Sequence, residues 1–334
     1  MHAARCLKKD AEKIKMRLFK QGLIDSRFRV MSDRKFVYFP LKRKAARLDI
    51  VQKDFENNAE RKTKLKDAVK DNLTAAELRQ LKTAFDIIGD IAILEIDEGL
   101  RSKERLIADA LQKINPKIKT ILRKSGRHEG EFRTQKMEFL AGIDSRESVH
   151  KENGIRLKLD VEKVYFSPRL STERKRIMQQ VKQNERILVM FSGCGPYVCV
   201  LSKNTKAKEV IGVEINPVGH EYAQQNLALN KLKNAKVYLG DVTEVVPTLG
   251  KFDRILMPLP KGAGAFLDMA LAAAENKCII HFYDFLKEGN EKLVHDKIKA
   301  ACRAAGRKCR IIKTVKCGQS APREYRVCVD FLVY

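Results

Sequence analysis

The stretch Glu185-Arg-Ile-Leu-Val-Met-Phe-Ser-Gly-Cys-Gly-Pro196 decides the fold of this chain. Its apolar first half predicts a short buried strand, and its second half is a glycine-rich turn. In open parallel sheets, a turn of this kind follows the first strand and binds a nucleotide-like ligand. The pattern therefore predicts an α/β domain in which Gly193, Cys194 and Gly195 lie against a cofactor.

Three more apolar segments follow this turn, and each ends in residues suited to the same site. Glu214 lies near the end of the second segment, where a carboxylate can accept hydrogen bonds from two ribose hydroxyls. Asp241 and Val242 end the third, and Asp241 is interpreted either as an acceptor at the adenine edge or as a turn-forming residue. The fourth runs into the rigid loop Pro258-Leu-Pro260. Because parallel strands end at one sheet edge, we expect these residues to meet there.

The turn itself discriminates between two cofactor classes. A nicotinamide dinucleotide site needs a third glycine, so that the following helix can approach the pyrophosphate. Here Pro196, Tyr197 and Val198 follow Gly195 instead. This departure favours S-adenosylmethionine, which has no pyrophosphate, over the cofactor of an NAD-dependent oxidoreductase.

The charge of the chain indicates a polyanionic partner. Its 334 residues, enough for two or three domains, include 67 Lys and Arg against 42 Asp and Glu, a formal net charge of +25. A general compositional bias would spread this charge evenly, whereas the basic residues gather in clusters. A basic surface of this kind attracts nucleic acid. The clusters are Lys8 to Arg17, Lys42 to Arg47, Arg61 to Lys70, Lys117 to Lys124 and Arg169 to Lys175.

Several function classes find no support in the residue pattern. The eight cysteines form no Cys-x-x-Cys and the six histidines show no ligand spacing, so we expect no metal site and reduced thiols. No apolar run reaches the roughly 18 residues that a membrane span needs. The amino terminus, Met1-His-Ala-Ala-Arg-Cys6, lacks a signal-peptide pattern, and we expect a cytoplasmic protein.

The remaining periodicities predict three domains. A small basic α+β domain spans 1–64, a middle α+β domain spans 65–163, and a Rossmann-like methyltransferase domain spans 164–334. The elements expected outside the first four cofactor strands are a helix over 5–22, a strand over 36–40, a helix beginning at Thr74, a strand with a glycine break over 85–96, and two terminal antiparallel strands over 308–317 and 325–334.

The segment Lys163-Val-Tyr-Phe-Ser-Pro-Arg-Leu-Ser-Thr-Glu-Arg-Lys-Arg176 gathers an aromatic pair, a proline, one carboxylate and several cations. A glutamate among cations stays ionised, so Glu173 is a candidate base. Ser171-Thr-Glu also opens a predicted helix, in which case Glu173 would stabilise the first turn electrostatically. Spacing alone leaves both interpretations open.

This segment, preceded by His150-Lys-Glu-Asn-Gly154, resembles the signature of the archaeal and eukaryotic tRNA (guanine-37 N1)-methyltransferase family. The resemblance covers essentially the whole chain, and its motifs are long and ordered. The further motifs that carry it are Gly130-Glu-Phe-Arg133, the cofactor turn, Glu214-Ile-Asn-Pro217, Gly240-Asp241 and Ala321-Pro-Arg-Glu-Tyr-Arg326.

The resemblance implies a three-domain enzyme that methylates the purine next to the anticodon, with the amino-terminal domain on the outer corner of the tRNA. Glu173 then matches the general base that removes the N1 proton, and Arg133 matches the arginine that stabilises charge on the purine oxygen. From the residues alone, Arg133 could equally form a surface ion pair. We expect a monomer that binds tRNA and needs no protein partner.

The same resemblance assigns residues to the two ligands. Tyr165 is expected to pack on the cofactor, although a core role is an equal alternative, and Arg169 to meet the cofactor carboxylate. Arg174 and the loop of Pro258, Leu259 and Pro260 are expected to contact the substrate, and Pro258 also the cofactor.

Two departures from the family pattern bear on the substrate. Pro258 stands where the family has an asparagine, which removes an amide that can hydrogen-bond the purine, and Val189 stands where aspartate is frequent. These changes resemble an archaeal branch linked to wyosine biosynthesis, whose members methylate N1 of guanosine, C7 of the tricyclic intermediate 4-demethylwyosine, or both. A larger tricycle with fewer guanine-edge contacts fits the loss of the asparagine.

The leading hypothesis is therefore a tRNA methyltransferase that acts on purine 37 by in-line transfer. One alternative is a wyosine-pathway aminocarboxypropyl transferase, a class that shares the cofactor sheet but lacks the amino-terminal domain. Another is a non-catalytic tRNA-binding protein that keeps the fold, against which the presence of Gly193, Gly195, Glu214 and Glu173 argues.

Overall fold

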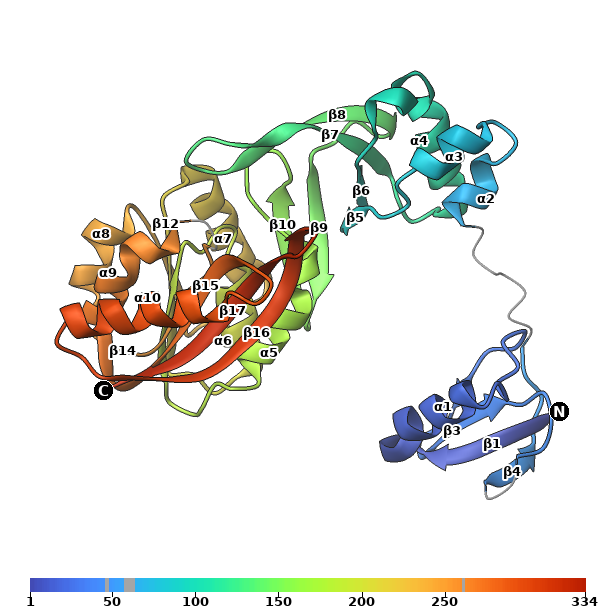
Figure 1. The fold of residues 1–334 in the computed structure, drawn as a ribbon, viewed down its shortest axis with the longest axis horizontal. Helices are drawn as coiled ribbons and strands as arrows, with labels where there is room; N and C mark the ends of the chain where they lie inside the picture. Colours follow the sequence, from blue (N-terminus) through green and yellow to red (C-terminus); the bar gives the residue numbers. More distant parts are fainter. Residues whose placement is uncertain (46–47, 57–63, 260–261) are drawn as a thin grey trace. The chain divides into compact units, whose positions relative to one another are not determined.

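The computed structural model describes residues 1–45, 48–56, 64–259 and 262–334 (Figure 1). Its backbone contacts divide the chain into two compact units, Met1–Ala68 and Val69–Tyr334. The finer division into three domains, with boundaries after residues 64 and 163, stays a prediction. Among the described residues, no helix combines the length and the apolar character that crossing a bilayer would require.

The first unit is a four-stranded sheet in the order β2-β3-β1-β4, with one α-helix packed against it. Its elements are β1 (His2–Leu7), the 3₁₀ helix η1 (Lys8–Asp10), α1 (Ala11–Lys20), β2 (Met31–Ser32), β3 (Phe36–Pro40) and β4 (Asp49–Gln52). The strand predicted over 36–40 is confirmed. The helix predicted over 5–22 is wrong at its start, because His2–Leu7 is extended and pairs with both β3 and β4. Tertiary strand pairing overrides the helical spacing there.

The second unit begins with small sheets and helices. The helix α2 (Leu65–Val69) crosses the boundary between the units, and it is followed by α3 (Ala75–Gln80), β5 (Asp86–Ile88), β6 (Ile91–Leu94), η2 (Glu98–Lys103), α4 (Glu104–Ile114), β7 (Thr120–Glu129), β8 (Thr134–Gly142), β9 (Glu147–Glu152) and β10 (Ile155–Asp160). Thr74 caps α3 reciprocally with Glu77, as its capping-box pattern predicts. The sheet order is β5-β6-β7-β8, and β9 pairs with β10.

The glycine break predicted within 85–96 turns the chain back on itself. β5 and β6 run antiparallel on either side of Gly89, so the predicted strand is a hairpin. Gly89 has φ of +60°, and a Cβ there would lie 2.1 Å from the hydroxyl oxygen of Ser148. Only glycine fits this turn. The next hairpin, β7–β8, is long and twisted, and extends from the small sheet toward the cofactor sheet (Figure 1).

The cofactor sheet has seven strands in the order β13-β12-β11-β14-β15-β17-β16. The first five are parallel, and β17 is antiparallel to both of its neighbours, which confirms the predicted terminal pair. Its elements are η3 (Pro168–Leu170), α5 (Ser171–Met178), β11 (Arg186–Met190), α6 (Pro196–Asn204), β12 (Glu209–Glu214), α7 (Pro217–Leu229), β13 (Ala235–Leu239), α8 (Val242–Val245), η4 (Val246–Thr248), β14 (Phe252–Met257), η5 (Ala263–Phe266), α9 (Leu267–Ala272), β15 (Ala274–Lys287), α10 (Glu291–Ala304), β16 (Cys309–Ala321) and β17 (Glu324–Val333).

The alternation of side chains along β11 explains how the sheet is buried on both faces. Ile187 and Val189 pack in the cluster that contains residues of α5 and α6, whereas Leu188 and Met190 pack in the cluster with α8, α9 and α10. Successive strand residues point to opposite faces, so a wholly apolar strand needs helices on both sides. β11 is central, and the chain leaves it toward β12 on one side and later returns to β14 on the other. This switch point places a ligand site at its carboxyl end.

Asn226 of α7 and Asn230, which follows the last residue of the helix, join it to strand β10. Asn226 accepts from the backbone N–H of Lys158 and donates to the backbone oxygen of the same residue, at 2.7 and 2.9 Å. Asn230 likewise accepts from the backbone N–H of Arg156 at 2.9 Å and donates to its backbone oxygen at 2.6 Å. The two amides, one helical turn apart, therefore satisfy the backbone groups along this edge of the β9–β10 pair.

Candidate cofactor and substrate site

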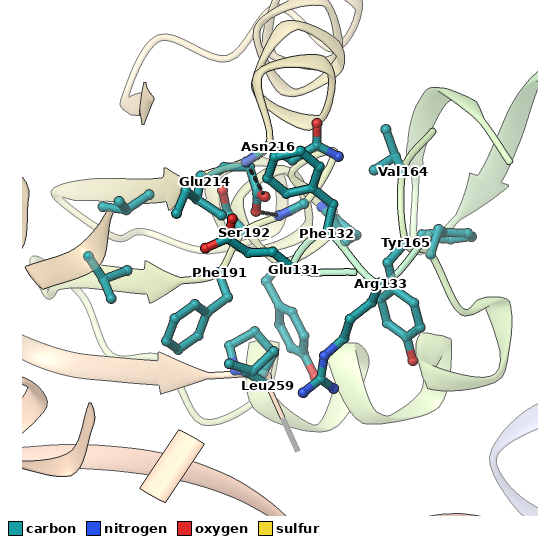
Figure 2. A pocket seen from close by; sticks show the side chains of 18 of the residues that line it. Glu131, Phe132, Arg133, Val164, Tyr165, Phe191, Ser192, Glu214, Asn216 and Leu259 are labelled. Carbon is teal, nitrogen blue, oxygen red and sulfur yellow. Dashed lines mark hydrogen bonds between the residues drawn. The ribbon is translucent and has the colours of Figure 1, made fainter. Parts of the chain in front are cut away.

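A cavity of about 200 Å³ lies at the carboxyl ends of the central strands. Residues from the strand ends form one wall, and the tip of the β7–β8 hairpin and the segment 164–174 form the other (Figure 2). Most of its surface is apolar, with a few polar groups, as is typical of small-molecule sites. It is lined by Glu131, Phe132, Arg133, Val164, Tyr165, Phe166, Ser167, Leu170, Arg174, Phe191, Ser192, Gly193, Pro196, Tyr197, Val213, Glu214, Ile215, Asn216, Gly240, Asp241, Val242, Pro258, Leu259 and Phe266.

The glycine-rich turn shapes the floor of this cavity. Gly193 lines the cavity with φ of +55°, and Gly195, the residue before α6, has φ of +80°. A Cβ on Gly195 would lie 3.3 Å from Cβ of Ala223, so the turn packs closely against α7. Cys194 is fully buried, and burial raises the pKa of its thiol to about 12. Cys194 and Gly195 therefore support the turn from behind, while Gly193 faces the cavity.

Glu214 is held at the strand end by backbone groups. One carboxylate oxygen accepts from the N–H of Gly193 at 2.6 Å, and the other accepts from the N–H of Asn216 at 2.9 Å (Figure 2). Burial raises the pKa of this carboxyl group, and the backbone hydrogen bonds oppose that rise. Each carboxylate oxygen has a second lone pair, so Glu214 is fixed in position and can still accept from ribose hydroxyls.

The loop after β13 and the loop after β14 complete this wall. Asp241 accepts from the backbone N–H and the hydroxyl of Thr243, each at 2.7 Å, and caps α8. Asp241 thus forms the turn that the sequence suggested as one alternative, and it also lines the cavity beside Val242. Pro258 and Leu259 line the cavity as well, whereas Pro260 lies outside the described residues.

The hairpin tip carries Arg133 to the site. Arg133 has φ of +51°, a left-handed conformation that side chains rarely adopt, and it follows Gly130 in the turn. Figure 2 shows Glu131, Phe132 and Arg133 projecting into the cavity from the hairpin. Burial lowers the pKa of the Arg133 guanidinium. Strained backbone at a cavity wall is a common feature of functional sites.

A second cavity, of about 320 Å³, adjoins the first and shares part of its wall. Arg133 and Tyr165 line both cavities, and the phenol of Tyr165 accepts a hydrogen bond from Arg326 at 2.9 Å. Lys124, Arg169 and Arg326 line only the second. Asp86 also lines the second cavity and pairs with Arg169, so its four cationic side chains face one carboxylate and it is the more cationic of the two.

The structure separates the three arginines of the segment 163–176. Arg169 donates to Asp86 at 2.6 Å and does not reach the first cavity. Arg174 lines the first cavity, but its guanidinium is buried and bound by both carboxylate oxygens of Glu152, at 2.5 and 2.6 Å. The third, Arg176, binds the carboxylates of Glu173 and Asp330. Of these predicted ligand contacts, the structure brings only Arg174 to the first cavity.

Glu173 occupies the first turn of α5, where the helix-opening pattern placed it, and is buried. Its carboxylate accepts from the guanidinium of Arg176 at 2.7 and 2.8 Å and from the phenol of Tyr283 at 2.8 Å. Glu173 lines neither of the two cavities. Tyr283 lies 2.8 Å from the phenol of Tyr197, a residue that does line the first cavity.

A buried polar network continues from Arg176 through the sheet. Arg176 also donates to Asp330, at 2.5 and 3.0 Å, and Asp330 accepts from Nδ1 of His281 at 2.7 Å. The guanidinium of Arg254 lies 2.7 Å from Nε2 of His281 and pairs with Glu185 at 2.7 and 2.9 Å. Because an arginine can only donate, Nε2 accepts and the proton of His281 is on Nδ1. Burial lowers the pKa of His281, in agreement with a neutral ring.

Within the part of the chain that the structure describes, His281, Cys328 and Asp330 are the group whose metal-ligand type atoms come together, within 4.8 Å. Both ring nitrogens of His281 are engaged in the hydrogen bonds described above, and the Cys328 thiol lies 3.3 Å from Asp330. These contacts account for the cluster as part of the polar network.

Several lining residues escaped the sequence interpretation. Phe191 and Ser192 immediately precede the glycine turn, and Asn216 follows Glu214, so nearness to these two motifs was the signal that could have found them. In the sequence, Tyr197 serves only to show that the third glycine is absent. Phe266 comes from η5 and carries no signal in the sequence.

The residues that line the cavity suit S-adenosylmethionine. Glu214 and the closely packed glycine turn suit ribose and backbone contacts, and Val242 and Phe191 supply apolar surface for a purine ring. The hydroxyl of Ser192 is buried beside Gly212 and has no hydrogen-bond partner among the described residues.

Comparisons with known proteins agree with this assignment. Residues 148–312 match the TRM5/TYW2 methyltransferase domain, residues 65–145 match the TYW2 N-terminal domain, and residues 5–49 match the tRNA methyltransferase 5 N-terminal domain. The tRNA (guanine(37)-N(1))-methyltransferase Trm5b of Pyrococcus abyssi is 36% identical over 326 residues, which cover 97% of each chain.

Two further relatives extend the comparison. The tRNA (guanine(37)-N(1))/4-demethylwyosine(37)-methyltransferase Taw22 of Nanoarchaeum equitans is 33% identical over 65% of this chain and 87% of its own. A solved structure described as the complex of aTrm5 and tRNALeu matches with a TM-score of 0.74 and 30% identity, covering all of both chains. These matches confirm the predicted fold class and family: the chain belongs to the TRM5/TYW2 family of S-adenosylmethionine-dependent methyltransferases.

Proposed function

We propose that this chain is a tRNA methyltransferase that transfers the methyl group of S-adenosylmethionine to the purine at position 37. The observation that carries the proposal is the first cavity, where the glycine turn and Glu214 face Arg133 and Tyr165 across one space. The likeness to Trm5b of Pyrococcus abyssi over 97% of both chains supports the same activity. The match of residues 5–49 to a tRNA methyltransferase 5 N-terminal domain favours methyl transfer over aminocarboxypropyl transfer.

The chemistry of guanine N1 defines what the side chains have to do. N1 carries a proton at neutral pH, so its lone pair is released only when that proton leaves and negative charge moves to O6. S-adenosylmethionine supplies an already activated methyl group, which leaves positioning and proton removal to the protein. In this proposal, Arg133 stabilises the charge on O6, and Glu173 is the carboxylate that receives the proton.

Pro258 bears on which purine is the substrate. It lines the cavity where an asparagine would offer an amide to the guanine edge, and proline has neither that amide nor a backbone N–H. We therefore propose that the site accepts both guanosine and the bulkier 4-demethylwyosine. The double activity in the name of the Nanoarchaeum equitans relative supports this proposal.

Nucleoside mass spectrometry tests the substrate directly. The protein and S-adenosylmethionine are incubated with one tRNA that has guanosine 37 and another that has 4-demethylwyosine 37. We expect a gain of one methyl group on both nucleosides. Methylation of guanosine alone would remove the tricycle from the proposal, and addition of an aminocarboxypropyl group would identify the other reaction of the family. Binding of tRNA without any product would favour the non-catalytic alternative.

The first unit is proposed to dock the tRNA. Its exposed lysines on η1 and α1, among them Lys9, Lys13 and Lys20, give it a basic surface, and neutralised phosphates make binding salt-dependent. Removing residues 1–60 is expected to weaken tRNA binding roughly tenfold and to flatten the plot of log affinity against log salt concentration.

The measurement is a tRNA titration at several salt concentrations, with S-adenosylmethionine affinity as a check that the second unit is intact. Wild-type tRNA affinity in the truncated protein would contradict the docking role. The same samples, run by sedimentation with and without tRNA, test the proposal that the enzyme acts as a monomer.

A further inference from the structure

The position of Glu173 does not by itself explain how it would receive a proton from the substrate. The inference drawn from this position rests on the proposed function. It is the candidate base, yet it lines neither cavity, and both of its oxygens are already bound by Arg176. The remaining partner of Glu173 is Tyr283, which is fully buried within the sheet. Tyr283 in turn contacts Tyr197, which lines the first cavity. The hydroxyl groups of Tyr197 and Tyr283 therefore link a residue of the cavity wall to the carboxylate of Glu173.

We propose that Tyr197 and Tyr283 form a proton relay that connects the substrate in the first cavity to Glu173. The direction of the relay follows from the hydrogen bonds. Tyr283 has one hydroxyl proton, which it donates to Glu173. In the hydrogen bond between the two phenols, Tyr197 is therefore the donor and Tyr283 the acceptor. The oxygen of Tyr197 then keeps a lone pair that this hydrogen bond does not use and that can accept a proton.

Both tyrosines are suited to pass a proton from one hydroxyl group to the next. Burial raises the pKa of each phenol well above its ordinary value, so both are neutral and hydrogen-bonded along one line. A neutral phenol can accept a proton at oxygen while it releases its own to the next group. The guanidinium of Arg174 lies 5.9 Å from the ring of Tyr197 and favours negative charge developing there during transfer.

The buried polar network around Glu173 and Arg176 can take up the proton. It contains three carboxylates, Glu173, Asp330 and Glu185, and two guanidiniums, Arg176 and Arg254, while the ring of His281 is neutral. The network therefore carries one net negative charge. One proton on Glu173 makes it neutral overall, which relieves the cost of keeping an unbalanced charge away from water.

Three proton transfers carry the N1 proton of guanosine to Glu173. The N1–H bond breaks and its proton moves to the oxygen of Tyr197, whose own proton moves to Tyr283, whose proton moves to Glu173. The carboxylate becomes a neutral acid, and both tyrosines end as neutral phenols. The electron pair freed on N1 forms the new bond to the methyl carbon, and the former carbon–sulfur bonding pair stays on sulfur.

Single substitutions that remove one hydroxyl test the relay. In Tyr197→Phe and in Tyr283→Phe, the single-turnover rate of methyl transfer to guanosine 37 is expected to fall by roughly tenfold or more. The double variant should be no slower than the slower single variant, because a chain broken once is already broken. Tyr222→Phe is the matched control: Tyr222 also donates to a carboxylate, that of Glu147 at 2.7 Å, but lies outside both cavities.

A proton inventory on the wild-type protein separates a relay from a structural role. If several protons move in the rate-limiting step, the plot of rate against the deuterium fraction of the solvent should be curved. This curvature should disappear in Tyr283→Phe. A straight inventory in the wild type, or unaltered rates in both phenylalanine variants, would overturn the relay. If Glu173→Gln is slow while both phenylalanine variants remain fast, the base role stands and the relay alone fails; a wild-type protein that methylates no tRNA removes both.

Discussion

Replacing Glu173 with glutamine is expected to lower the single-turnover rate of methyl transfer to guanosine N1 by about 10²- to 10⁴-fold, the usual contribution of a positioned proton acceptor. Glutamine keeps the shape of the side chain and can still accept from Tyr283, but its amide cannot take up the proton. The affinity for S-adenosylmethionine should stay unchanged, because Glu173 does not line the first cavity. Rapid-quench methyl transfer and calorimetric titration of the cofactor measure the two quantities separately.

Glu209→Gln provides the control for this substitution. Glu209 is a partly exposed carboxylate of β12 that pairs with Arg186 and Lys236, away from both cavities. Its replacement removes one carboxylate charge from the same unit without touching the proton path. Wild-type single-turnover rates in Glu173→Gln would exclude Glu173 as the proton acceptor, and the resemblance-based role of this residue would then have to be abandoned.

Replacing Arg254 with methionine is expected to destabilise the protein by about 3–5 kcal/mol, the cost of removing one partner of a buried ion pair. The side chain of Arg254 is completely buried and binds Glu185, His281 and the backbone oxygen of Gln180. Methionine fills a similar length but leaves the carboxylate of Glu185 with no counter-charge in the interior. Urea unfolding followed by circular dichroism measures the change.

Lys236→Met is the matched control in the same sheet. Lys236 pairs with Glu209 at 3.2 Å, but its side chain is 64% exposed, and exposed pairs contribute about 0–1 kcal/mol. A loss below about 1 kcal/mol in Arg254→Met would mean that the buried network adds little to stability and that Glu185 finds water or another donor once Arg254 is gone.

The parallel sheet and its turn were predictable because local pattern specifies them. The apolar runs that end at Met190, Glu214 and Met257 are buried strands, and Gly193 needs a left-handed conformation that its residue type allows. Their common position at one sheet edge follows from the general topology of such folds. By contrast, helical spacing was misleading at His2–Leu7, where pairing with two distant strands decides the conformation.

The surroundings of the candidate base could not be predicted from the sequence. Tyr283 lies 110 positions away from Glu173, and Asp330 lies 154 positions from Arg176. Nothing in the local pattern around Glu173 indicates these partners, because they meet only after β15 and β17 pair in the sheet. For the same reason, the ion pair between Arg169 and Asp86 was not foreseen, although Arg169 itself was recognised as a functional candidate.

The asparagine contacts along β10 have a consequence for how copies of this protein behave in a crowded cell. A strand at the edge of a small sheet usually offers open hydrogen-bonding groups on which a strand from another molecule can add, and this is a common route to aggregation. Asn226 and Asn230 imitate such an added strand with their own amides and occupy the positions at Arg156 and Lys158. The protein thereby closes this edge to its neighbours without needing another strand.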